Sequence, residues 1–509
     1  MRDALEILPG IAVGANAVEL RVDLLAKYDA SYIADQVGLL RKTVDLPIIY
    51  TIRTKSQGGM FPDEDLDSIK SLLLFGIKIG VDVIDLQLIS PNDVIDEVMA
   101  KRSHTKVIAS HHDFTGQLKW DNVEWKTKYD QGVAINADIV KLVGKAVDFN
   151  DNLLLEKFRS ENTTKPLIGL NMGPKGKLSR VLNTVFTPVT HDLITDKPQG
   201  VGQLTFKEIN EAYFQIGGFI ENRFWVVGSP IEHSRSPALH NAGYKALSLP
   251  YKFDRFESSD AETVYKQLML RSDFGGLAIT MPLKLDMMKY VTKLSDAAKL
   301  VGAINTIVPI DGGGGFLGDN TDWVGITNSF KQSGFIGGNN VNGLVVGGGG
   351  TSRAAIYALH KLGCEKIYLL NRTVSKLHDV ASSFPKEYNL EVVEQEEQVS
   401  GKPVSLAVSC VPSSAPLDET LLQRLELILD SNKPTTAAAA AADEEAPLLL
   451  EAAYKPRVTP VMRLAEEKYN WRVIQGVEML VNQGEEQFKI HTGFAPPYDV
   501  IHDAVVAED

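Results

Sequence analysis

The chain has 509 residues, 44% of them hydrophobic and 23% charged, which is typical of a globular protein and too long for one hydrophobic core. The net charge of −13 argues against nucleic acid as the main partner, and no apolar run is long enough to span a membrane. The two cysteines, Cys364 and Cys410, are too few for a disulfide framework, so we expect a cytoplasmic protein.

Short apolar segments alternate with amphipathic stretches through the first 200 residues. This alternation predicts an α/β domain with a parallel sheet, and the number of units indicates a (β/α)8-type barrel. The predicted strands are residues 17–25, 47–54, 82–88, 106–112, 138–143, 166–172 and 185–190. Because a barrel of this type has eight strands, we expect its first strand to be missing and the chain to begin inside its first domain.

Two further α/β units follow a helix predicted at 206–218. A strand at 223–228 opens the first of them, and a strand, a glycine turn and a helix from residue 341 open a Rossmann-type unit. The expected domains are 1–218, then 219–330 completed by C-terminal helices over 478–509, and 331–477. We assign no chemistry to the alanine-rich segment 435–447.

Lys141 lies within the apolar run of residues 138–143. A lysine among apolar side chains loses hydration of its charged form, which lowers its pKa and makes the amine a potential nucleophile toward a carbonyl. The alternative is a strand-end lysine whose stem packs while its head reaches water. His112 and Arg53 lie at the ends of neighbouring predicted strands, where the active residues of such barrels are found. Together these residues favour Schiff-base chemistry on a carboxylated ketone.

The motifs "VELRVDLL", "TIRTKSQGG", "ASHHDF", "ADIVKLV" and "KGKLSR" occur in the order found in type I 3-dehydroquinate dehydratases, and residues 5–215 resemble that family. The resemblance implies that Lys141 forms an imine with the C3 ketone of 3-dehydroquinate, and that His112 moves protons as base and acid. It also implies substrate contacts from Glu19, Arg21, Arg53, Arg180 and Gln203. Gln57 stands where many members carry a glutamate.

A second group of polar residues follows predicted strands in the middle of the chain. Ser234 and Ser236 form a hydroxyl pair, for which the alternative is the capped start of a helix at Pro237. The other members are Thr280, Lys284, Asn305 and Asp322. The alternative for Lys284 is a solvated lysine. Amine, amide and carboxylate groups at strand ends predict a site for a polyhydroxylated substrate.

The segment "LVVGGGGTSRAA" predicts a dinucleotide site, because glycines between a strand and a helix let the backbone approach a pyrophosphate. Its candidate contacts are Gly347, Gly349, Gly350 and Thr351. An acidic residue usually ends the next strand of an NAD enzyme. This chain has "NRTVSK" instead, with Asn371, Arg372, Thr373 and Lys376, which favours the extra phosphate of NADP.

Residues 222–505 resemble shikimate dehydrogenase through "GSPIEHSRSPALHN", "TMPLK", "GAINT", "NTDW", "NRT" and "QGVEMLVNQG". The resemblance implies that Lys284 and Asp322 form the catalytic pair, with Lys284 as proton donor. It also implies that shikimate is bound by Ser234, Ser236, Thr280, Asn305, Asp322 and Gln483. A helix from about residue 478 should return to the substrate-binding domain.

The two resemblances are chemically continuous, since the product of the first reaction, 3-dehydroshikimate, is the substrate of the second. "RTKSQGGMFPD" and "AAYKPRVTP" look like the C-terminal part of fungal pentafunctional AROM polypeptides, so other AROM domains are expected partners if the chain is longer. No metal or membrane contact is expected, and a homodimer is one assembly that stays open. The alternatives are a silent quinate- or shikimate-sensing repressor-like protein, or a chain with only the dehydrogenase active. The presence of Lys141, His112, Lys284 and Asp322 favours an enzyme.

Overall fold

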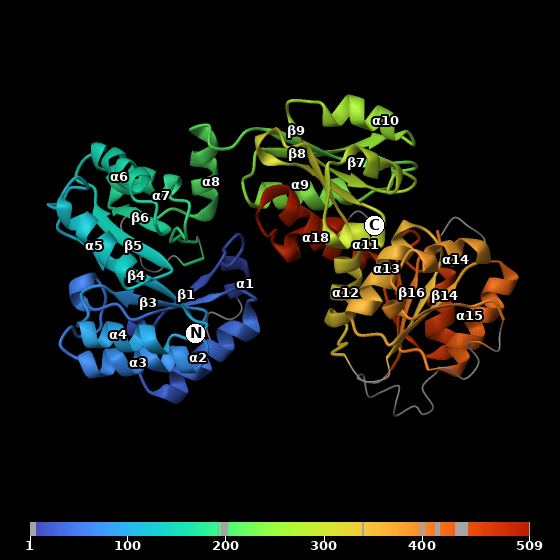
Figure 1. Ribbon diagram of the computed structural model, residues 1–509, viewed down its shortest axis with the longest axis horizontal. Helices are drawn as coiled ribbons and strands as arrows, with labels where there is room; N and C mark the ends of the chain where they lie inside the picture. Colours follow the sequence, from blue (N-terminus) through green and yellow to red (C-terminus); the bar gives the residue numbers. More distant parts are fainter. Residues whose placement is uncertain are drawn as a thin grey trace. The chain divides into compact units, whose positions relative to one another are not determined.

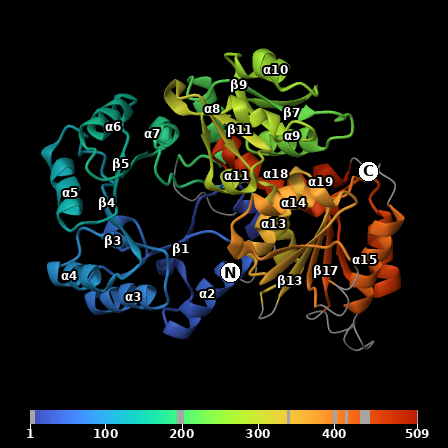
Figure 2. The same ribbon diagram turned by 45° about the vertical axis from the view of Figure 1, so that its right-hand side comes forward.

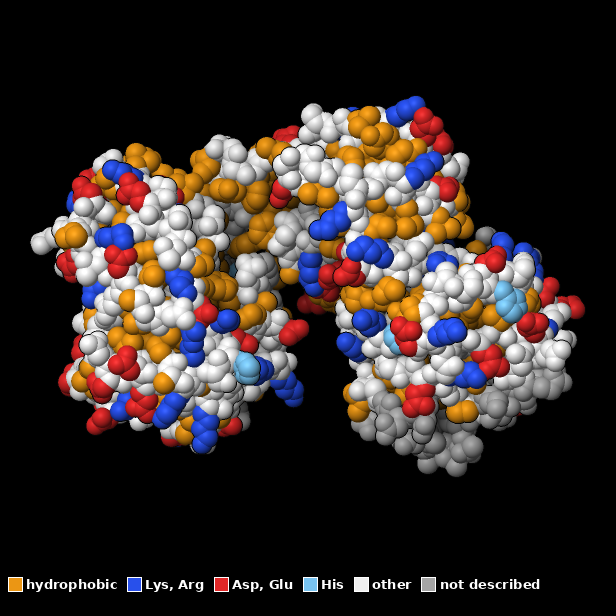
Figure 3. Space-filling view, viewed as in Figure 1, with side chains coloured by type: hydrophobic (Ala, Val, Ile, Leu, Met, Phe, Trp, Pro, Cys, Tyr) orange, Lys and Arg blue, Asp and Glu red, His pale blue; other side chains and the backbone are white. Residues whose placement is uncertain are grey.

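The computed structural model describes residues 7–191, 193–194, 202–337, 341–395, 398, 403–412, 418–432 and 446–507. Its chain divides into two compact units, Met1–Ile220 with Leu247–Leu249, and Glu221–Ala246 with Pro250–Asp509. None of the described helices is both long and apolar enough to cross a membrane. On the face seen in Figure 3, basic and acidic side chains are interspersed. Most of the alanine-rich segment lies outside the described residues.

The first unit is built on a parallel sheet whose strands follow their order in the chain (Figure 1). The strands are β1 (Val18–Arg21), β2 (Ile48–Thr51), β3 (Val83–Gln87), β4 (Lys106–His112), β5 (Ile139–Lys145) and β6 (Leu167–Met172). The helices are α1 (Leu8–Ile11), α2 (Ala30–Thr43), α3 (Leu66–Lys78), α4 (Asn92–Lys101), α5 (Val123–Ala134), α6 (Asn150–Glu161), α7 (Lys177–Leu182) and α8 (Phe206–Gln215). The predicted βα alternation and the helix near 206–218 are confirmed.

The seventh predicted strand, 185–190, is wrong. Among the described residues this segment forms only an isolated bridge between Thr190 and Thr205. Phe186 has a φ of 39°, and the Asn183 side chain donates to the Val185 carbonyl at 2.6 Å. A positive φ and local side-chain bonds curl the chain and compete with a strand ladder. The described part of the unit is therefore an open six-stranded sheet and not a closed barrel.

Alternate residues of these strands point to opposite faces of the sheet. One set, which includes Tyr50 and Ile84, packs against helices α2–α4 in a buried cluster. The helices lie along that face in both views (Figures 1 and 2). The other set, which includes Ile49, Val83 and Val143, forms a separate cluster on the inner face. A side chain two or four residues beyond a member of this inner cluster, at the carboxyl end of the strand, therefore also faces inward, away from the helices.

The second unit contains two sheets. In the first the order is β10-β12-β11-β9-β7-β8 and in the second it is β15-β14-β13-β16-β17-β18. The first has strands β7 (Asn222–Gly228), β8 (Tyr251–Glu257), β9 (Phe274–Ile279), β10 (Lys293–Leu294), β11 (Thr306–Pro309) and β12 (Phe316–Asp319). The second has strands β13 (Asn342–Val346), β14 (Lys366–Leu370), β15 (Leu390–Val392), β16 (Leu406–Ser409), β17 (Leu448–Glu451) and β18 (Arg472–Ile474).

The second of these sheets is wholly parallel and has the strand order of a doubly wound dinucleotide-binding fold. Val345 and Leu369 belong to one core and Leu344 and Leu370 to another, so helices cover both faces (Figure 1). The predicted Rossmann-type unit is confirmed. The helices of the second unit are α9 (Ser236–Ala246), α10 (Ala261–Val264), α11 (Asp296–Val301), α12 (Asp322–Gln332), α13 (Gly350–Lys361), α14 (Val374–Ser382), α15 (Glu419–Ser431), α17 (Pro460–Arg463), α18 (Gly476–Thr492) and α19 (Tyr498–Val506).

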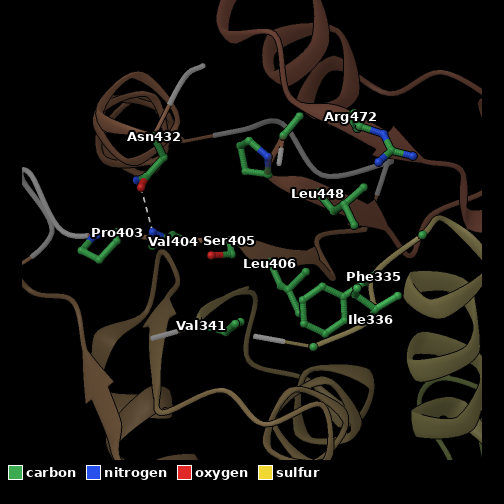
Figure 4. Close-up of a pocket in the computed structure, with 14 residues that line it drawn as sticks. Phe335, Ile336, Val341, Pro403, Val404, Ser405, Leu406, Asn432, Leu448 and Arg472 are labelled. Atoms are coloured by element: carbon green, nitrogen blue, oxygen red, sulfur yellow. Dashed lines mark hydrogen bonds between the residues drawn. The ribbon is translucent and has the colours of Figure 1, made fainter. Parts of the chain in front are cut away.

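A pocket of about 420 Å³ lies at the amino ends of β13, β16 and β17 (Figure 4). Phe335, Leu406 and Leu448 line it, and the Asn432 side chain accepts a hydrogen bond from the backbone of Val404 at 2.7 Å. Ligands of parallel α/β sheets bind at the carboxyl ends of the strands. This pocket therefore lies at the edge of the sheet away from the expected cofactor site.

Candidate active sites

The sequence-predicted residues that lie on or just after the strands, among them Lys141, Arg53 and His112, share the inner face of the first sheet. Lys141 lies two residues before Val143 on β5, and Arg53 lies four residues after Ile49, just beyond β2. Both side chains therefore point to the same face as this inner cluster. The pairing of β4 with β5 sets Ser110 beside Lys141. Because all the strands are parallel, their carboxyl ends gather these side chains at one edge.

Lys141 is buried, as expected, but its amine is not enclosed by apolar side chains alone. Its Nζ donates to Asp85 of β3 at 3.2 Å and lies 3.8 Å from Glu19 of β1. Asp85 is fully buried, whereas a third of the Glu19 side chain is exposed. The expected surround of apolar side chains alone is therefore not found, because two carboxylates, one from β3 and one from β1, face the amine.

Arg53 and His112 meet beside this pair. One Arg53 nitrogen donates to Asp85 at 2.5 Å, and another lies 3.3 Å from Nδ1 of His112. Burial, followed by the charges of Arg53 and Lys141, holds the pKa of His112 well below its usual range, so the ring is neutral. The Gln57 side chain accepts a hydrogen bond from the His112 backbone at 2.8 Å, which fixes the end of β4.

Arg180 and Gln203 both lie in the segments that follow β6. Arg180 donates to the Pro188 carbonyl at 3.3 Å, and the Thr190 backbone donates to Leu204 at 3.0 Å. Among the described residues, the Nε of Arg180 and the Oε1 of Gln203 are buried without a hydrogen-bond partner. Burial lowers the pKa of Arg180 to about 10. A buried guanidinium with an unused donor is suited to an anionic ligand.

Arg21 faces the same edge of the sheet from β1. Its guanidinium forms a bidentate ion pair with Asp23 at 2.9 and 2.8 Å. Asp23 also accepts from the backbone of Arg53 and of Met60. Asp23 therefore links the two arginines, although the sequence did not single it out.

The second site is a pocket of about 250 Å³ in the second unit. Of the residues expected to bind or convert a substrate, it is lined by Ser234, Ser236, Thr280, Lys284, Asn305, Asp322 and Gln483. All the residues predicted to bind shikimate thus line one cavity. Thr351, which was expected to contact the cofactor, also lines it.

Lys284 and Asp322 form an ion pair in this pocket. Lys284 comes from the loop after β9, and Asp322 is the first residue of α12. The other Asp322 oxygen accepts from Asn305 at 2.8 Å, which fixes the carboxylate. The Lys284 Nζ also lies 3.5 Å from the Thr351 hydroxyl at the start of α13. The amine therefore stands where the two sheets of the unit meet.

The amide groups of Asn305 and Gln483 are largely occupied by neighbouring residues. The Asn305 nitrogen donates to Thr321 and Gln483 as well as to Asp322, and its oxygen accepts from Thr306 and from the Thr321 backbone. This network joins β11, α12 and α18. In this arrangement Asn305 orients Asp322.

Tyr454 lines the same pocket as Ser234 and Ser236 and was not predicted from the sequence. Burial raises its pKa. The two serines lie 3.3 Å apart through their hydroxyls, at the start of α9. The segment "AAYKPRVTP" contains Tyr454, but its distance from the serine motif in the sequence gave no sign that the two line one pocket.

The glycine turn joins β13 to α13. Gly347 has a φ of 124°, and a side chain there would meet Ser352 and Cys410 at 2.9 and 3.2 Å, so glycine is required. A Cβ at Gly349 would meet nothing within 4 Å. The backbone at the start of this helix of 12 residues is therefore open to a ligand, and helix N-termini favour phosphate groups.

The residues after β14 lie at the same edge of the sheet as the glycine turn. A Cβ at Gly348 would meet the Asn371 side chain at 3.0 Å. Arg372, Thr373 and Lys376 are exposed, and neither cation forms an ion pair within the described part of the chain. Their charges are available to an anionic group beside the turn.

Comparison with protein-family models divides the chain in the same way. Residues 1–220 match type I 3-dehydroquinase, 226–307 match the shikimate dehydrogenase substrate binding domain, and 476–506 match the shikimate 5'-dehydrogenase C-terminal domain.

Curated relatives cover the whole chain. The pentafunctional AROM polypeptide 1 of Lodderomyces elongisporus is 65% identical over 100% of this chain, and the pentafunctional AROM polypeptide of Kluyveromyces lactis is 51% identical over 100%. The chain spans 32% of the length of each of these relatives.

Among solved structures, the dehydroquinate dehydratase and shikimate dehydrogenase from S. pombe AroM has a TM-score of 0.84 and is 39% identical. The match covers 99% of this chain and 96% of that one. A shikimate 5-dehydrogenase from Thermus thermophilus, solved with NADP(H) and shikimate, is 26% identical with a TM-score of 0.45 and covers 56% of this chain and 99% of that one.

Proposed function

Because this chain belongs to the family of fused type I 3-dehydroquinate dehydratases and shikimate dehydrogenases, we propose that it catalyses two consecutive reactions. The first unit dehydrates 3-dehydroquinate to 3-dehydroshikimate. The second unit reduces 3-dehydroshikimate to shikimate with NADPH. The observation that carries the proposal is that each unit holds a lysine amine against a carboxylate beside strand ends, Lys141 with Asp85 and Lys284 with Asp322.

In the first unit, Lys141 attacks the C3 ketone of the substrate, and the ketone oxygen leaves as water when the imine forms. His112 then removes a proton from C2, and the electron pair moves toward the positively charged imine nitrogen. The hydroxyl at C1 leaves with a proton returned by His112, and water releases the product and restores the amine. The neutral ring of His112 suits the step in which it accepts a proton.

Arg180 and Gln203 hold the substrate in the first unit. The unused Arg180 donor binds the carboxylate, and the unpartnered Gln203 oxygen accepts from a substrate hydroxyl. Glu19, Arg21 and Arg53 complete the contacts at the ends of β1 and β2. This division follows from the fact that Arg53 and Arg21 already pair with carboxylates, whereas Arg180 does not among the described residues.

In the second unit, bound NADPH supplies the hydride to the carbonyl carbon of 3-dehydroshikimate. Lys284 donates the proton that the carbonyl oxygen requires, and Asp322 orients the amine. Ser234 and Ser236 bind the substrate carboxylate and Thr280 a hydroxyl group, while Asn305 and Gln483 exchange part of their present bonds to hold the other hydroxyl groups. The open backbone at Gly349 fits a pyrophosphate, with Gly347, Gly350 and Thr351 beside it, and Arg372 with Asn371, Thr373 and Lys376 fits the 2′-phosphate of NADP.

We also propose the domain limits given by the sequence, with a dehydratase over 1–218, a shikimate-binding domain over 219–330 joined by 478–509, and a cofactor domain over 331–477. In a longer polypeptide the partners of these domains are the other AROM domains. A cytoplasmic location and a homodimer belong to the same proposal.

A coupled assay tests the function. The chain is supplied with 3-dehydroquinate and NADPH, and both NADPH loss and shikimate formation are followed. We expect both signals in equal amounts. If NADPH is consumed only when 3-dehydroshikimate is added, the dehydratase activity is contradicted and the dehydrogenase activity is not. Binding of shikimate without any oxidation by NADP contradicts the second and indicates a sensor.

A further inference from the structure

We propose that Asp85 is a positioning residue of the first site, which holds the amine of Lys141 at a fixed position relative to Arg53 and His112. The proposal rests on the proposed dehydratase function. Asp85 lies on β3, between the strands that supply the other groups, and is 1% exposed. It was not among the residues expected from the sequence.

The contacts of Asp85 come from three strands or strand ends. Its Oδ2 accepts from Arg53 at 2.5 Å and from Lys141 at 3.2 Å, and its Oδ1 accepts from the Ser110 hydroxyl at 2.5 Å. The Ser110 oxygen in turn accepts from Arg53 at 2.9 Å. One carboxylate oxygen thus fixes the distance between the amine and the guanidinium.

The guanidinium extends this arrangement to the base. Arg53 lies 3.3 Å from Nδ1 of His112, so a continuous chain of contacts runs from the Lys141 amine through Asp85 and Arg53 to the imidazole. A nucleophile and a base must approach adjacent carbons of one substrate, and errors of about 1 Å are costly. Asp85 supplies the common anchor.

The charge of Asp85 is maintained by its neighbours. Burial alone raises the pKa of a carboxyl group, but Arg53, Lys141 and Ser110 hold the pKa of Asp85 far below its ordinary range. The buried anion faces the nitrogen that becomes positively charged in the imine. A fixed negative charge there stabilises the imine in the form that accepts electrons from C2.

Glu19 does not replace Asp85. Its oxygen lies farther from the amine, at 3.8 Å, and also accepts from the Thr51 hydroxyl at 2.7 Å. Its side chain is more exposed, so solvent screens its charge. The anchor for Lys141 is therefore the buried carboxylate of β3.

The test compares Asp85→Asn with wild type and with Asp82→Asn in the full chain. Asp82 immediately precedes the same strand but pairs with Arg41 outside the site. We expect Asp85→Asn to lower kcat for 3-dehydroquinate about 10²–10³-fold while KM changes less than about threefold. Borohydride labelling of Lys141 with substrate, followed by mass spectrometry, should slow in parallel. Asp82→Asn should match wild type in both measurements.

Several results separate the proposal from its premise. Wild-type kcat in Asp85→Asn, or a raised KM at unchanged kcat, overturns the positioning role while labelling of wild-type Lys141 upholds the Schiff base. Dehydration by wild type without labelling at Lys141 overturns the Schiff base and the proposal with it. If Asp85→Asn does not fold, Ser110→Ala decides, because it removes one bond to the carboxylate and leaves the charge. We then expect about a tenfold loss of kcat at constant KM, and unchanged kcat overturns the role.

Discussion

The two units each hold a lysine beside an aspartate, but they build the pair in different ways. Lys141 and Asp85 both lie on strands of one sheet, and Asp85 is fully enclosed. Lys284 comes from a loop and Asp322 from the first turn of a helix. Lys284 lies within reach of Thr351 on α13, whereas the described polar contacts of Lys141, to Asp85 and Glu19, come from its own sheet.

This difference matches the proposed chemistry. A lysine that forms a covalent bond must keep one position through several steps, and strands of one sheet hold a side chain more precisely than loops do. A lysine that only donates a proton must instead reach a substrate held by one sheet and a cofactor held by another. In the proposed mechanism, the same pair of residue types therefore serves as a nucleophile on strands and as a proton donor between a loop and a helix.

Lys141→Ala gives the largest expected effect and tests whether the pairs are independent. Loss of the nucleophile should lower dehydration by about 10⁴-fold or more, because no other amine takes its place. Shikimate oxidation by NADP should stay within about twofold of wild type. Steady-state rates of both reactions on one preparation measure this. Lys106→Ala, on the neighbouring strand β4, is the control. An equal loss of dehydration in Lys106→Ala and Lys141→Ala would contradict the assignment of Lys141 as the nucleophile.

Lys284→Ala tests the other pair. The lysine is needed mainly when charge develops on the carbonyl oxygen, so turnover of 3-dehydroshikimate should fall about 10²–10⁴-fold. Shikimate affinity should change little, since Ser234 and Ser236 remain. Turnover and calorimetric binding are measured together, with Lys289→Ala as the control. Normal turnover in Lys284→Ala contradicts the assignment of Lys284 as the proton donor.

Arg372→Ala addresses the cofactor, which only the second unit is proposed to use. Removal of a guanidinium from the 2′-phosphate should weaken NADP binding by about 1.5–3 kcal/mol, the value of a hydrogen bond to a charged group. Dissociation constants for NADP and NAD are measured on both proteins. NAD binding should not change. Equal use of the two cofactors by wild type contradicts our interpretation of the residues after β14.

The smallest expected effect concerns acid stability of the second unit. His240 is stacked on Phe253, and burial lowers its pKa to about 3. The unfolded chain takes up a proton near pH 6.5 and the folded chain does not, so stability is complete above that pH and is lost as pH falls toward 3. Between pH 6.5 and 5.5 the loss is about 1 kcal/mol for this histidine.

His240→Phe should remove that part of the pH dependence. Hydrogen exchange of amides in α9 and α18, measured at pH 6.5 and 5.5 after correction for intrinsic rates, reports the opening free energy of the unit. The change between the two pH values should be smaller in the variant by about 1 kcal/mol. An equal change in both proteins shows that His240 does not titrate as its burial indicates.

Features encoded over short distances could be predicted from the sequence. The strand that carries Lys141 and the turn at Gly347 each depend on about ten consecutive residues, and both are found in the structure. The failed strand at 185–190 is also local in origin, but its cause is the positive φ of Phe186, which hydrophobic patterning does not reveal.

Contacts between strands could not be predicted in the same way. Asp85 interrupts an apolar run and reads as an exposed residue until the register of β3, β4 and β5 is known. That register depends on how the strands pack against helices that come from distant parts of the sequence. The occupied amide of Asn305 was hidden for the same reason, because its partner Gln483 is 178 residues away.

That long separation has a consequence for synthesis of the protein. The helix α18, which bears Gln483, leaves the ribosome only after the whole sheet β13–β18 has been made. Until then the face that α18 will cover, around Leu239 of α9, is exposed to the cell. The last described strand of the first sheet ends at Met172, so that sheet can fold while translation continues. Chaperone demand and the risk of aggregation during translation therefore fall on the second unit.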